Sequence, residues 1–226
     1  MQKTTATIAR MPARIEGRGA IPHEKGVFFR VWAPHAKKVF VTGDFNNWSE
    51  SGHEMNHEGD GYWGADIADA AVNSEYKYII HTEKEKLFRN DPYAKEVTNS
   101  NGNSLVIDPH FEWTDHDFDM PAWNELVIYE MHVGTFNVKE DGEPGTFYSV
   151  KERLGYLKAL GVNAIEIMPA TEFPGGFSWG YNPSHPFAIE RDYGGVKGFK
   201  ELVNAAHEVG IALILDVVYN HFGPDD

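Results

Sequence analysis

The residues from Asp216 to His221 bring a carboxylate, an amide and an imidazole together directly after an apolar run, Leu213-Ile214-Leu215. Runs of this kind are typical of strands buried on both faces, as in parallel sheets. Polar groups just past the carboxyl end of a parallel strand lie where α/β folds bind ligands. Asp216 and His221 could therefore orient a polar substrate, although the pattern alone also fits a structural carboxylate and a surface histidine.

A second group of candidates lies in a long connection rich in glycine, proline and aromatic residues. It runs from Pro169 to Val196 and contains Phe177, Trp179 and Tyr181. Connections of this length inside compact folds are usually either functional or disordered. Disordered segments are poor in aromatic residues, so we expect a functional loop.

The elements that must position these residues alternate between strand and helix after residue 124. Strands are expected at Leu126–Val133, Val162–Met168 and Ile211–Val218, and helices at Val150–Leu160 and Gly198–Val209. This alternation predicts a parallel sheet with crossover helices. No functional role is predicted for His132, which lies in the first of these strands.

Residues 26–108 have a different pattern, in which short β-rich runs alternate with turn clusters. Strands are expected at Val27–Trp32, Lys38–Thr42, Tyr62–Ile67, Glu75–His81 and Leu105–Ile107. Such spacing predicts a small antiparallel sandwich, with Trp32 in its core. The expected division is an N-terminal extension at 1–25, the sandwich at 26–108, a linker without Lys or Arg at 109–123, and the α/β part at 124–226.

Composition excludes several classes of function. The net charge of −14 argues against nucleic-acid binding, because phosphate contacts need clustered Lys and Arg. With no cysteine there is no disulfide or thiolate chemistry. Neither a signal-peptide apolar region nor a run of about 18 apolar residues for a membrane span is found. We expect a soluble, cytoplasmic protein without a membrane partner.

Three motifs of the α/β part resemble those of the α-amylase superfamily, glycoside hydrolase family 13, in order and spacing. They are Gly161–Pro169, Trp179-Gly180-Tyr181-Asn182-Pro183 and Asp216–His221. The N-terminal part resembles carbohydrate-binding module family 48 through Phe29–Pro34 and Val41–Trp48. The resemblance implies an immunoglobulin-like β-sandwich followed by the first three strands of a (β/α)8 TIM barrel. Ile165, Ile167 and Val217 are then expected on the inner face of that unfinished barrel.

The resemblance also implies roles for individual residues. Tyr181 would stack on the sugar ring next to the scissile bond, since aromatic faces suit the C–H face of a pyranose. His221 would donate hydrogen bonds to that ring, Asp216 would anchor the strand end, and Trp179 would complete the substrate-binding set. Asn220 occupies the position of a calcium ligand in some relatives, but branching enzymes usually lack the ion, so no cofactor is expected.

Retaining chemistry in this family needs a nucleophile Asp after the fourth barrel strand and an acid/base Glu after the fifth. Both positions fall beyond Asp226, so no catalytic residue is expected in this chain and the 226 residues alone should be inactive.

The sandwich carries a possible glucan surface site. In regulatory relatives the residue matching Trp48 stacks on glucan, and the one matching Lys77 reaches a sugar hydroxyl. Leu87-Phe88 stands where those relatives have a second binding Trp. Weak or absent glucan binding is therefore expected at this surface.

The resemblance leaves the reaction open, with glycogen, starch or maltooligosaccharides as the expected partners. A 1,4-α-glucan branching enzyme, which transfers a glucan chain through a covalent glycosyl-enzyme, is the first hypothesis. Hydrolysis by an α-amylase or a maltooligosyl-trehalose trehalohydrolase is the second, for which Gly223-Pro224 and Asp192–Gly195 are suggestive. A non-catalytic glycogen-binding protein is the third.

Overall fold

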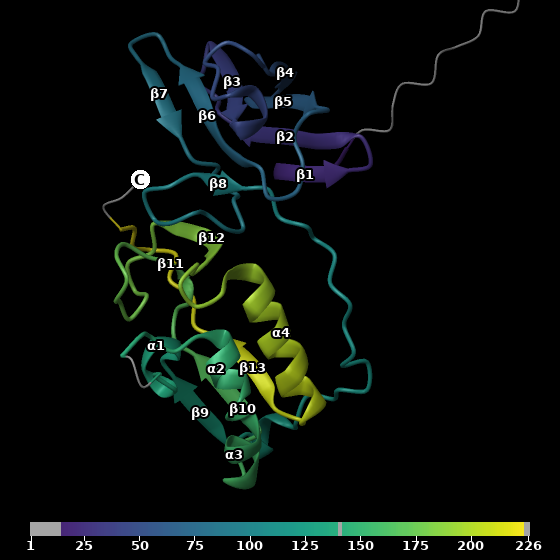
Figure 1. The fold of residues 1–226 in the computed structure, drawn as a ribbon, viewed down its shortest axis with the longest axis vertical. Helices are drawn as coiled ribbons and strands as arrows, with labels where there is room; N and C mark the ends of the chain where they lie inside the picture. The colour runs from purple at the N-terminus through teal and green to yellow at the C-terminus, as the bar shows by residue number, and fades with distance from the viewer. Residues whose placement is uncertain (1–14, 140–141, 224–226) are drawn as a thin grey trace, which may run out of the picture.

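The computed structural model describes residues 15–139 and 142–223 of the protein. Figure 1 shows a β part and an α/β part stacked along the long axis, with a linker running down one side between them. The order of a β-sandwich followed by parallel α/β structure is the one that the sequence predicts. Among the described residues, no helix is long and apolar enough to cross a membrane.

The β part consists of two sheets, ordered β1-β2-β5-β4 and β3-β6-β7, with β8 also paired to β6. The strands are β1 (Gly19–His23), β2 (Gly26–Trp32), β3 (Lys38–Gly43), β4 (Asn56–Gly59), β5 (Tyr62–Ile67), β6 (Glu75–His81), β7 (Lys86–Arg89) and β8 (Ser104–Leu105). Four of the five predicted strands are present near their expected bounds, whereas the one expected at Leu105–Ile107 is found at Ser104–Leu105. Strands β1, β4 and β7 were not anticipated, and β1 pairs with β2 although it lies in the segment assigned to the N-terminal extension.

The core between the sheets is built on aromatic residues. Phe29 and Tyr76 are fully buried, with ring centroids 4.9 Å apart. The prediction that Trp32 is a core residue is wrong, because its side chain is 53% exposed. Val27, Phe29 and Val31 point inward, so the two-residue period of a strand places Trp32 on the outer face.

The linker has no helix or strand from residue 109 to residue 122. It lies against α4 (Gly195–Glu208). The Phe118 ring stacks on His207 with centroids 4.0 Å apart, and the His207 ring pairs with Asp115. Aromatic and charged contacts of this kind attach the linker to the α/β part along the C-terminal half of the helix.

The α/β part contains a parallel sheet in the order β13-β10-β9. Its strands are β9 (Ile128–Met131), β10 (Ala164–Ile167) and β13 (Ala212–Leu215), and its other helices are α1 (Val133–Phe136), α2 (Phe147–Lys151) and α3 (Leu154–Ala159). There are also single-turn helices, η1 (Asp44–Asn46) and η2 (Trp123–Glu125). The helix predicted at 150–160 is two helices, the first of which begins at a Thr146–Ser149 capping box.

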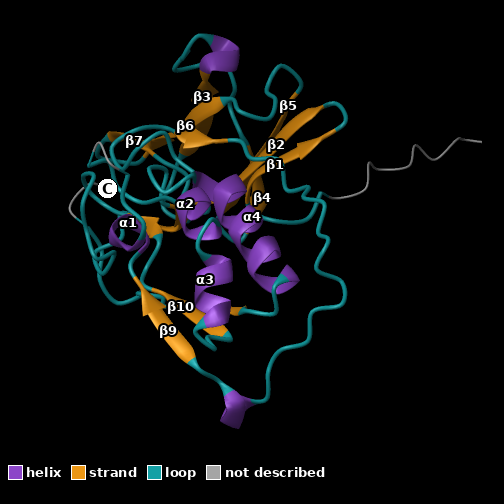
Figure 2. Ribbon diagram, turned by 60° about the horizontal axis from the view of Figure 1, so that its bottom comes forward, coloured by secondary structure: helices purple, strands orange, loops and turns teal. Residues whose placement is uncertain are grey.

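Helices cover one face of the parallel sheet, as Figure 2 shows for α2, α3 and α4. Ile165 and Ile167 are fully buried in a cluster with Leu157 and Leu202 from those helices. Their expected place on the inner barrel face is therefore wrong. Of the three residues expected to lose burial, only Val217 is exposed, at 49% of its surface. The alternation of side chains along β10 leaves Glu166, not the isoleucines, for the opposite face.

Candidate functional site

The candidate site lies at the carboxyl-terminal edge of the parallel sheet. His132 follows β9, and Asp216 follows β13. Between them in the chain, the segment after β10 forms an unpredicted antiparallel hairpin of β11 (Thr171–Glu172) and β12 (His185–Ile189). The hairpin loop, residues 173–184, carries the aromatic side chains and is called the Tyr181 loop below.

Glycine lets the Tyr181 loop pack against the end of β10. Gly180 has φ of +85°, and a Cβ atom at this position would lie 1.9 Å from the carbonyl oxygen of Pro169. Only a residue without a side chain fits such an approach. Gly180 therefore fixes where the neighbouring Trp179 and Tyr181 leave the loop.

Tyr181 and Asp216 are in direct contact. The Tyr181 hydroxyl donates a hydrogen bond of 2.8 Å to a carboxylate oxygen of Asp216. This hydrogen bond raises the pKa of Tyr181, and the charges of Glu130 and Glu166 add to the effect. The ring stays neutral and 40% exposed, so an apolar face is available to a ligand while the hydroxyl is held in place.

His132 ties the Tyr181 loop to the end of β9. One ring nitrogen lies 2.8 Å from the carbonyl oxygen of Ser178, and the other lies 3.1 Å from the hydroxyl of Thr135. Beside this contact is a cavity of about 500 Å³, lined by His132, Phe177, Trp179 and others. Trp179 is 73% exposed, so it offers a large aromatic surface at the same edge as Tyr181.

The side chains of Asn220 and His221 are exposed, and neither forms a hydrogen bond or an ion pair within the described residues. The segment that carries them is nevertheless attached to the Tyr181 loop, because the amide of Gly223 donates a 2.7 Å bond to the carbonyl of Pro183. The structure thus brings Asp216 and Tyr181 together and keeps His221 in a segment bound to the same loop at both ends. Pro224 lies outside the described residues.

Asn220 matches a calcium-ligand position of some relatives. Residues 15–139 and 142–223 contain no group of three or more His, Asp or Glu side chains arranged to hold a metal ion. A calcium site would need several oxygen ligands converging on one point.

Two buried carboxyl groups hold the base of the Tyr181 loop. Glu190 accepts hydrogen bonds from the amides of Phe173 and Asp192, at 3.3 and 3.0 Å. Glu172 accepts one of 3.1 Å from the amide of Arg191. Burial, with the charge of Glu190 adding to it, raises the pKa of Glu172 to about 8, and burial raises that of Glu190 to about 7.

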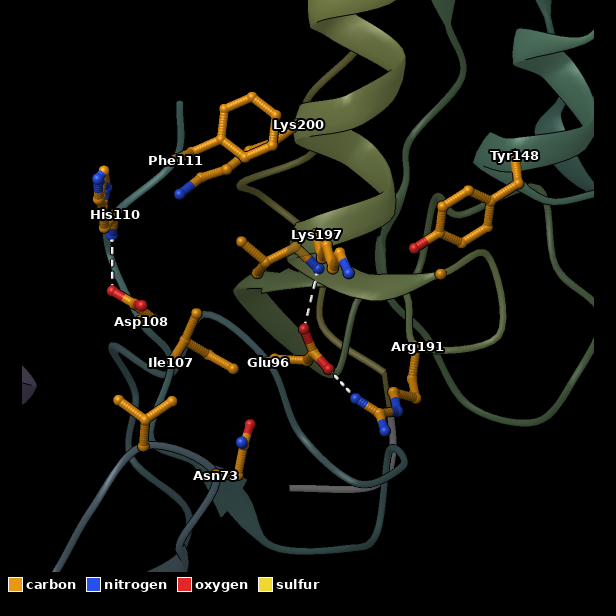
Figure 3. Close-up of a pocket in the computed structure, with 13 residues that line it drawn as sticks. Asn73, Glu96, Ile107, Asp108, His110, Phe111, Tyr148, Arg191, Lys197 and Lys200 are labelled. Atoms are coloured by element: carbon orange, nitrogen blue, oxygen red, sulfur yellow. Dashed lines mark hydrogen bonds and ion pairs between the residues drawn. The ribbon is translucent and has the colours of Figure 1, made fainter. Parts of the chain in front are cut away.

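The same region joins the β-sandwich side of the chain to the α/β part. Figure 3 shows Glu96 pointing at both Arg191 and the first turn of α4. Its carboxylate pairs with the Arg191 guanidinium and accepts a 2.9 Å bond from the amide of Val196. Glu96 is 6% exposed, and it supplies the acceptor that the helix lacks because its N-cap is Gly194.

Trp48 and Lys77 lie at one end of the β3–β6 sheet. The amide of Trp48 donates a hydrogen bond to the carbonyl of Gly43. The preceding residue, Thr42, is paired with Lys77 across the sheet. Trp48 is 38% exposed, and Phe88, at the position expected to lack the second Trp, is 43% exposed. Burial and the nearby Arg89 lower the pKa of Lys77.

Sequence reasoning missed four residues that shape the site: His132, Glu172, Glu190 and Glu96. His132 could have been found, because the carboxyl ends of parallel strands meet at one edge and it directly follows the first of them. The three glutamates gave no signal, since Glu is rarely buried and nothing in the sequence marks it as such.

Comparisons with known proteins identify the families that the two parts of the chain match. Residues 18–94 match the family described as carbohydrate-binding module 48 (isoamylase N-terminal domain), and residues 93–226 match the alpha amylase catalytic domain. Among solved structures, a putative alpha amylase from Salmonella typhimurium is 32% identical with a TM-score of 0.80, covering 94% of this chain and 35% of its own. A pullulanase from Anoxybacillus sp. LM18-11, solved with maltotetraose, is 27% identical with a TM-score of 0.77, over 92% of this chain and 36% of its own.

Curated relatives carry two different names. A malto-oligosyltrehalose trehalohydrolase of Saccharolobus solfataricus is 42% identical over 89% of this chain and 34% of its own length. A 1,4-alpha-glucan branching enzyme of Picrophilus torridus is 39% identical, over 89% of this chain and 29% of its own. The chain thus spans about a third of the length of these relatives. With the amylase catalytic match extending over more than half of its residues, the chain belongs to the alpha-amylase family.

Proposed function

We propose that this chain is the N-terminal part of a retaining α-glucan-active enzyme and that the Tyr181 loop forms part of its glucose-binding site. Tyr181 would stack on the sugar ring at the scissile bond, and His221 would donate hydrogen bonds to its hydroxyls. Asp216 would hold the Tyr181 hydroxyl in place and anchor the end of β13. Trp179 would extend the aromatic surface to the next part of the glucan chain.

The observation that carries this proposal is the hydrogen bond between Tyr181 and Asp216, 35 residues apart in sequence. It fixes the phenol ring at the carboxyl edge of the parallel sheet with 40% of its surface free. Aromatic faces in such positions bind the apolar side of a pyranose ring, and neighbouring hydroxyl, imidazole and carboxylate groups bind its hydroxyls. The similar pullulanase from Anoxybacillus sp. LM18-11, solved with maltotetraose and with maltotriose, supports an α-glucan as the ligand.

For the complete enzyme, glucan chain transfer as in branching enzymes is the first candidate reaction. Hydrolysis is the second, favoured by the 42% identity to the trehalohydrolase against 39% to the branching enzyme of P. torridus. Either reaction would proceed through a covalent glycosyl-enzyme, and either suits a cytoplasmic protein without cysteine. The residues assigned here bind and orient the sugar, so glucan binding is the property to test on this chain.

The test is a calorimetric titration of the protein with maltoheptaose. Tyr181→Ala should weaken binding roughly three- to tenfold, because an aromatic contact contributes about 0.5–1.5 kcal/mol beyond its burial. Tyr181→Phe keeps the ring and should bind within about twofold of the wild type. Tyr156→Ala is the matched control, since Tyr156 is 59% exposed on α3, away from the sheet edge. Equal affinity for Tyr181→Ala and the wild type would contradict the assignment.

The glucan surface site on the sandwich is tested separately. We propose that Trp48 and Lys77 add little affinity, because Phe88 takes the place of the second binding Trp. Retention of the protein on immobilised amylose should therefore be the same for Trp48→Ala as for the wild type. A loss of retention in Trp48→Ala, with retention kept in Tyr181→Ala, would show that the sandwich binds glucan on its own.

A further inference from the structure

Two adjoining cavities lie on the β-sandwich, and one of them reaches the α/β part. One has a volume of about 470 Å³ and mainly apolar walls that include Ile21, Phe187 and Ile189. The other has a volume of about 600 Å³ and a more polar lining. Both are lined by Arg18, Tyr93 and Lys95, and neither shares a lining residue with the cavity beside Trp179. The two cavities therefore adjoin each other and are separate from the proposed glucose site.

The Arg18 side chain lies between the two cavities and is held in position by two tyrosines. Its guanidinium carbon lies 5.4 Å from the centre of the Tyr62 ring and 5.5 Å from that of Tyr93. One nitrogen donates a 2.7 Å hydrogen bond to the Tyr62 hydroxyl. A guanidinium has five N–H donors in a planar fork, so this arrangement orients the group and leaves most of its donors for a ligand.

Lys95 and Lys200 add positive charge to the walls of the apolar cavity. The Lys95 ammonium lies 5.1 Å from the centre of the Phe187 ring, and Phe187 stacks on Tyr93 at 5.9 Å with the planes 17° apart. Within the described part of the chain, neither Arg18 nor Lys95 forms an ion pair with an acid.

Acids also lie in the walls, but none of them forms an ion pair with Arg18 or Lys95 in the described part of the chain. They are Glu16 in the polar cavity and Asp108 in the apolar one, and Asp108 already accepts a 2.9 Å hydrogen bond from the amide of His110. Arg30, also in the polar wall, is matched by Glu58 at 2.6 Å. Besides Arg30, the walls thus carry three cations and two acids, and the buried carboxyl of Asp91 adds a third acid close to Lys95.

We propose that the two cavities form a binding site for a small organic anion with a flat apolar body. The carboxylate or phosphoryl group would be bound by the Arg18 fork and the Lys95 ammonium, which are the donor types suited to planar and tetrahedral oxyanions. The apolar body would lie beside Phe187 in the smaller cavity. Sites of this volume, largely apolar with a few placed polar groups and located between domains, are typical of small-molecule ligands.

The experiment uses three probes in calorimetric titrations of the protein: phenyl phosphate, inorganic phosphate and phenol. Phenyl phosphate should bind saturably and more tightly than either fragment. Arg18→Gln and Lys95→Gln should each weaken it roughly tenfold, the effect of losing a charge-assisted hydrogen bond. Lys25→Gln is the control, because it removes the same charge from an exposed lysine that lines neither cavity.

Phe187→Ala separates the two halves of the proposal. It should weaken phenyl phosphate binding several-fold while leaving inorganic phosphate unchanged. The proposal is overturned by any of three results: no saturable binding of phenyl phosphate up to about 10 mM, phenol binding as tightly as phenyl phosphate, or unchanged affinity in Arg18→Gln and Lys95→Gln. Maltoheptaose affinity, measured on the same variants, should stay at the wild-type value and reports that they are folded.

Discussion

The two buried carboxyls at the base of the Tyr181 loop should make the protein less stable as the pH rises towards 8. Glu172 and Glu190 are each 2% exposed. Burial raises their pKa values to about 8 and about 7, from an ordinary value of 4.5. Between the ordinary and the raised pKa, each group is protonated in the folded protein and ionised in the unfolded chain.

The sign and size of the effect follow from proton linkage. Because the folded state binds more protons in this window, the free energy of unfolding falls as the pH increases. The stabilisation is fully present below pH 4.5 and has been lost once the pH passes about 8. One proton of difference corresponds to about 1.4 kcal/mol per pH unit, so each carboxyl contributes a slope of up to that size.

Glu172→Gln is the sharper of the two possible substitutions. Glutamine imitates the protonated carboxyl, and its one carbonyl oxygen can still accept the single hydrogen bond from the Arg191 amide. Glu190→Gln would lose one of two accepted bonds, since Phe173 donates to one oxygen of Glu190 and Asp192 to the other. In urea unfolding measured from pH 6 to pH 9, the free energy of unfolding of Glu172→Gln should rise relative to that of the wild type. The difference should grow by up to about 1.4 kcal/mol per pH unit and level off near pH 8.

The comparison removes the titration of the groups that do not interact with Glu172, because those are common to both proteins. Glu152→Gln, at an exposed position after α2, should run parallel to the wild type across the whole range. A constant difference between Glu172→Gln and the wild type would refute the reasoning, since it would mean that Glu172 ionises at the same pH in both states.

Three further substitutions test the framework around the site. Glu96→Ala should lower the free energy of unfolding by about 1–2 kcal/mol, measured in urea, because α4 loses its only side-chain cap and Arg191 its partner; a change below about 0.5 kcal/mol would contradict this role. Gly180→Ala should cost about 1–3 kcal/mol and weaken maltoheptaose binding, whereas Gly161→Ala, with a similar φ of +88° and open space around it, should leave binding unchanged. Leu157→Ala should cost about 2–5 kcal/mol in thermal or urea unfolding, because the side chain is fully buried between helices and sheet.

The sequence predicted the parts of the fold whose pattern reflects burial directly. The strands at Tyr62–Ile67 and Glu75–His81 have the expected bounds, because inward residues such as Tyr76 and Tyr78 alternate with polar ones. Strands β4 and β7 escaped prediction since they lie at sheet edges with mostly exposed, polar residues. Their pairing partners, rather than their own composition, make them strands.

Errors in side-chain direction have a related origin. Trp32 was placed in the core on residue type, yet its parity along β2 puts it outside. Ile165 and Ile167 were placed inside the barrel, yet they face the helices. A run that is apolar throughout does not reveal which of its two faces each residue joins. For the site, the order of motifs placed Tyr181 and Asp216 at one edge, and only coordinates could supply the hydrogen bond between them.

The contacts around residues 190–196 explain how two domains with separate cores can act on one loop. Glu190 closes the base of the Tyr181 loop, and the next residue, Arg191, pairs with Glu96 from the sandwich side. Glu96 also caps α4, whose Leu202 belongs to the core of the α/β part. A shift of the sandwich relative to α4 would therefore either break the Glu96 contacts or disturb the Tyr181 loop. The sandwich can thus support the Tyr181 loop through packing alone.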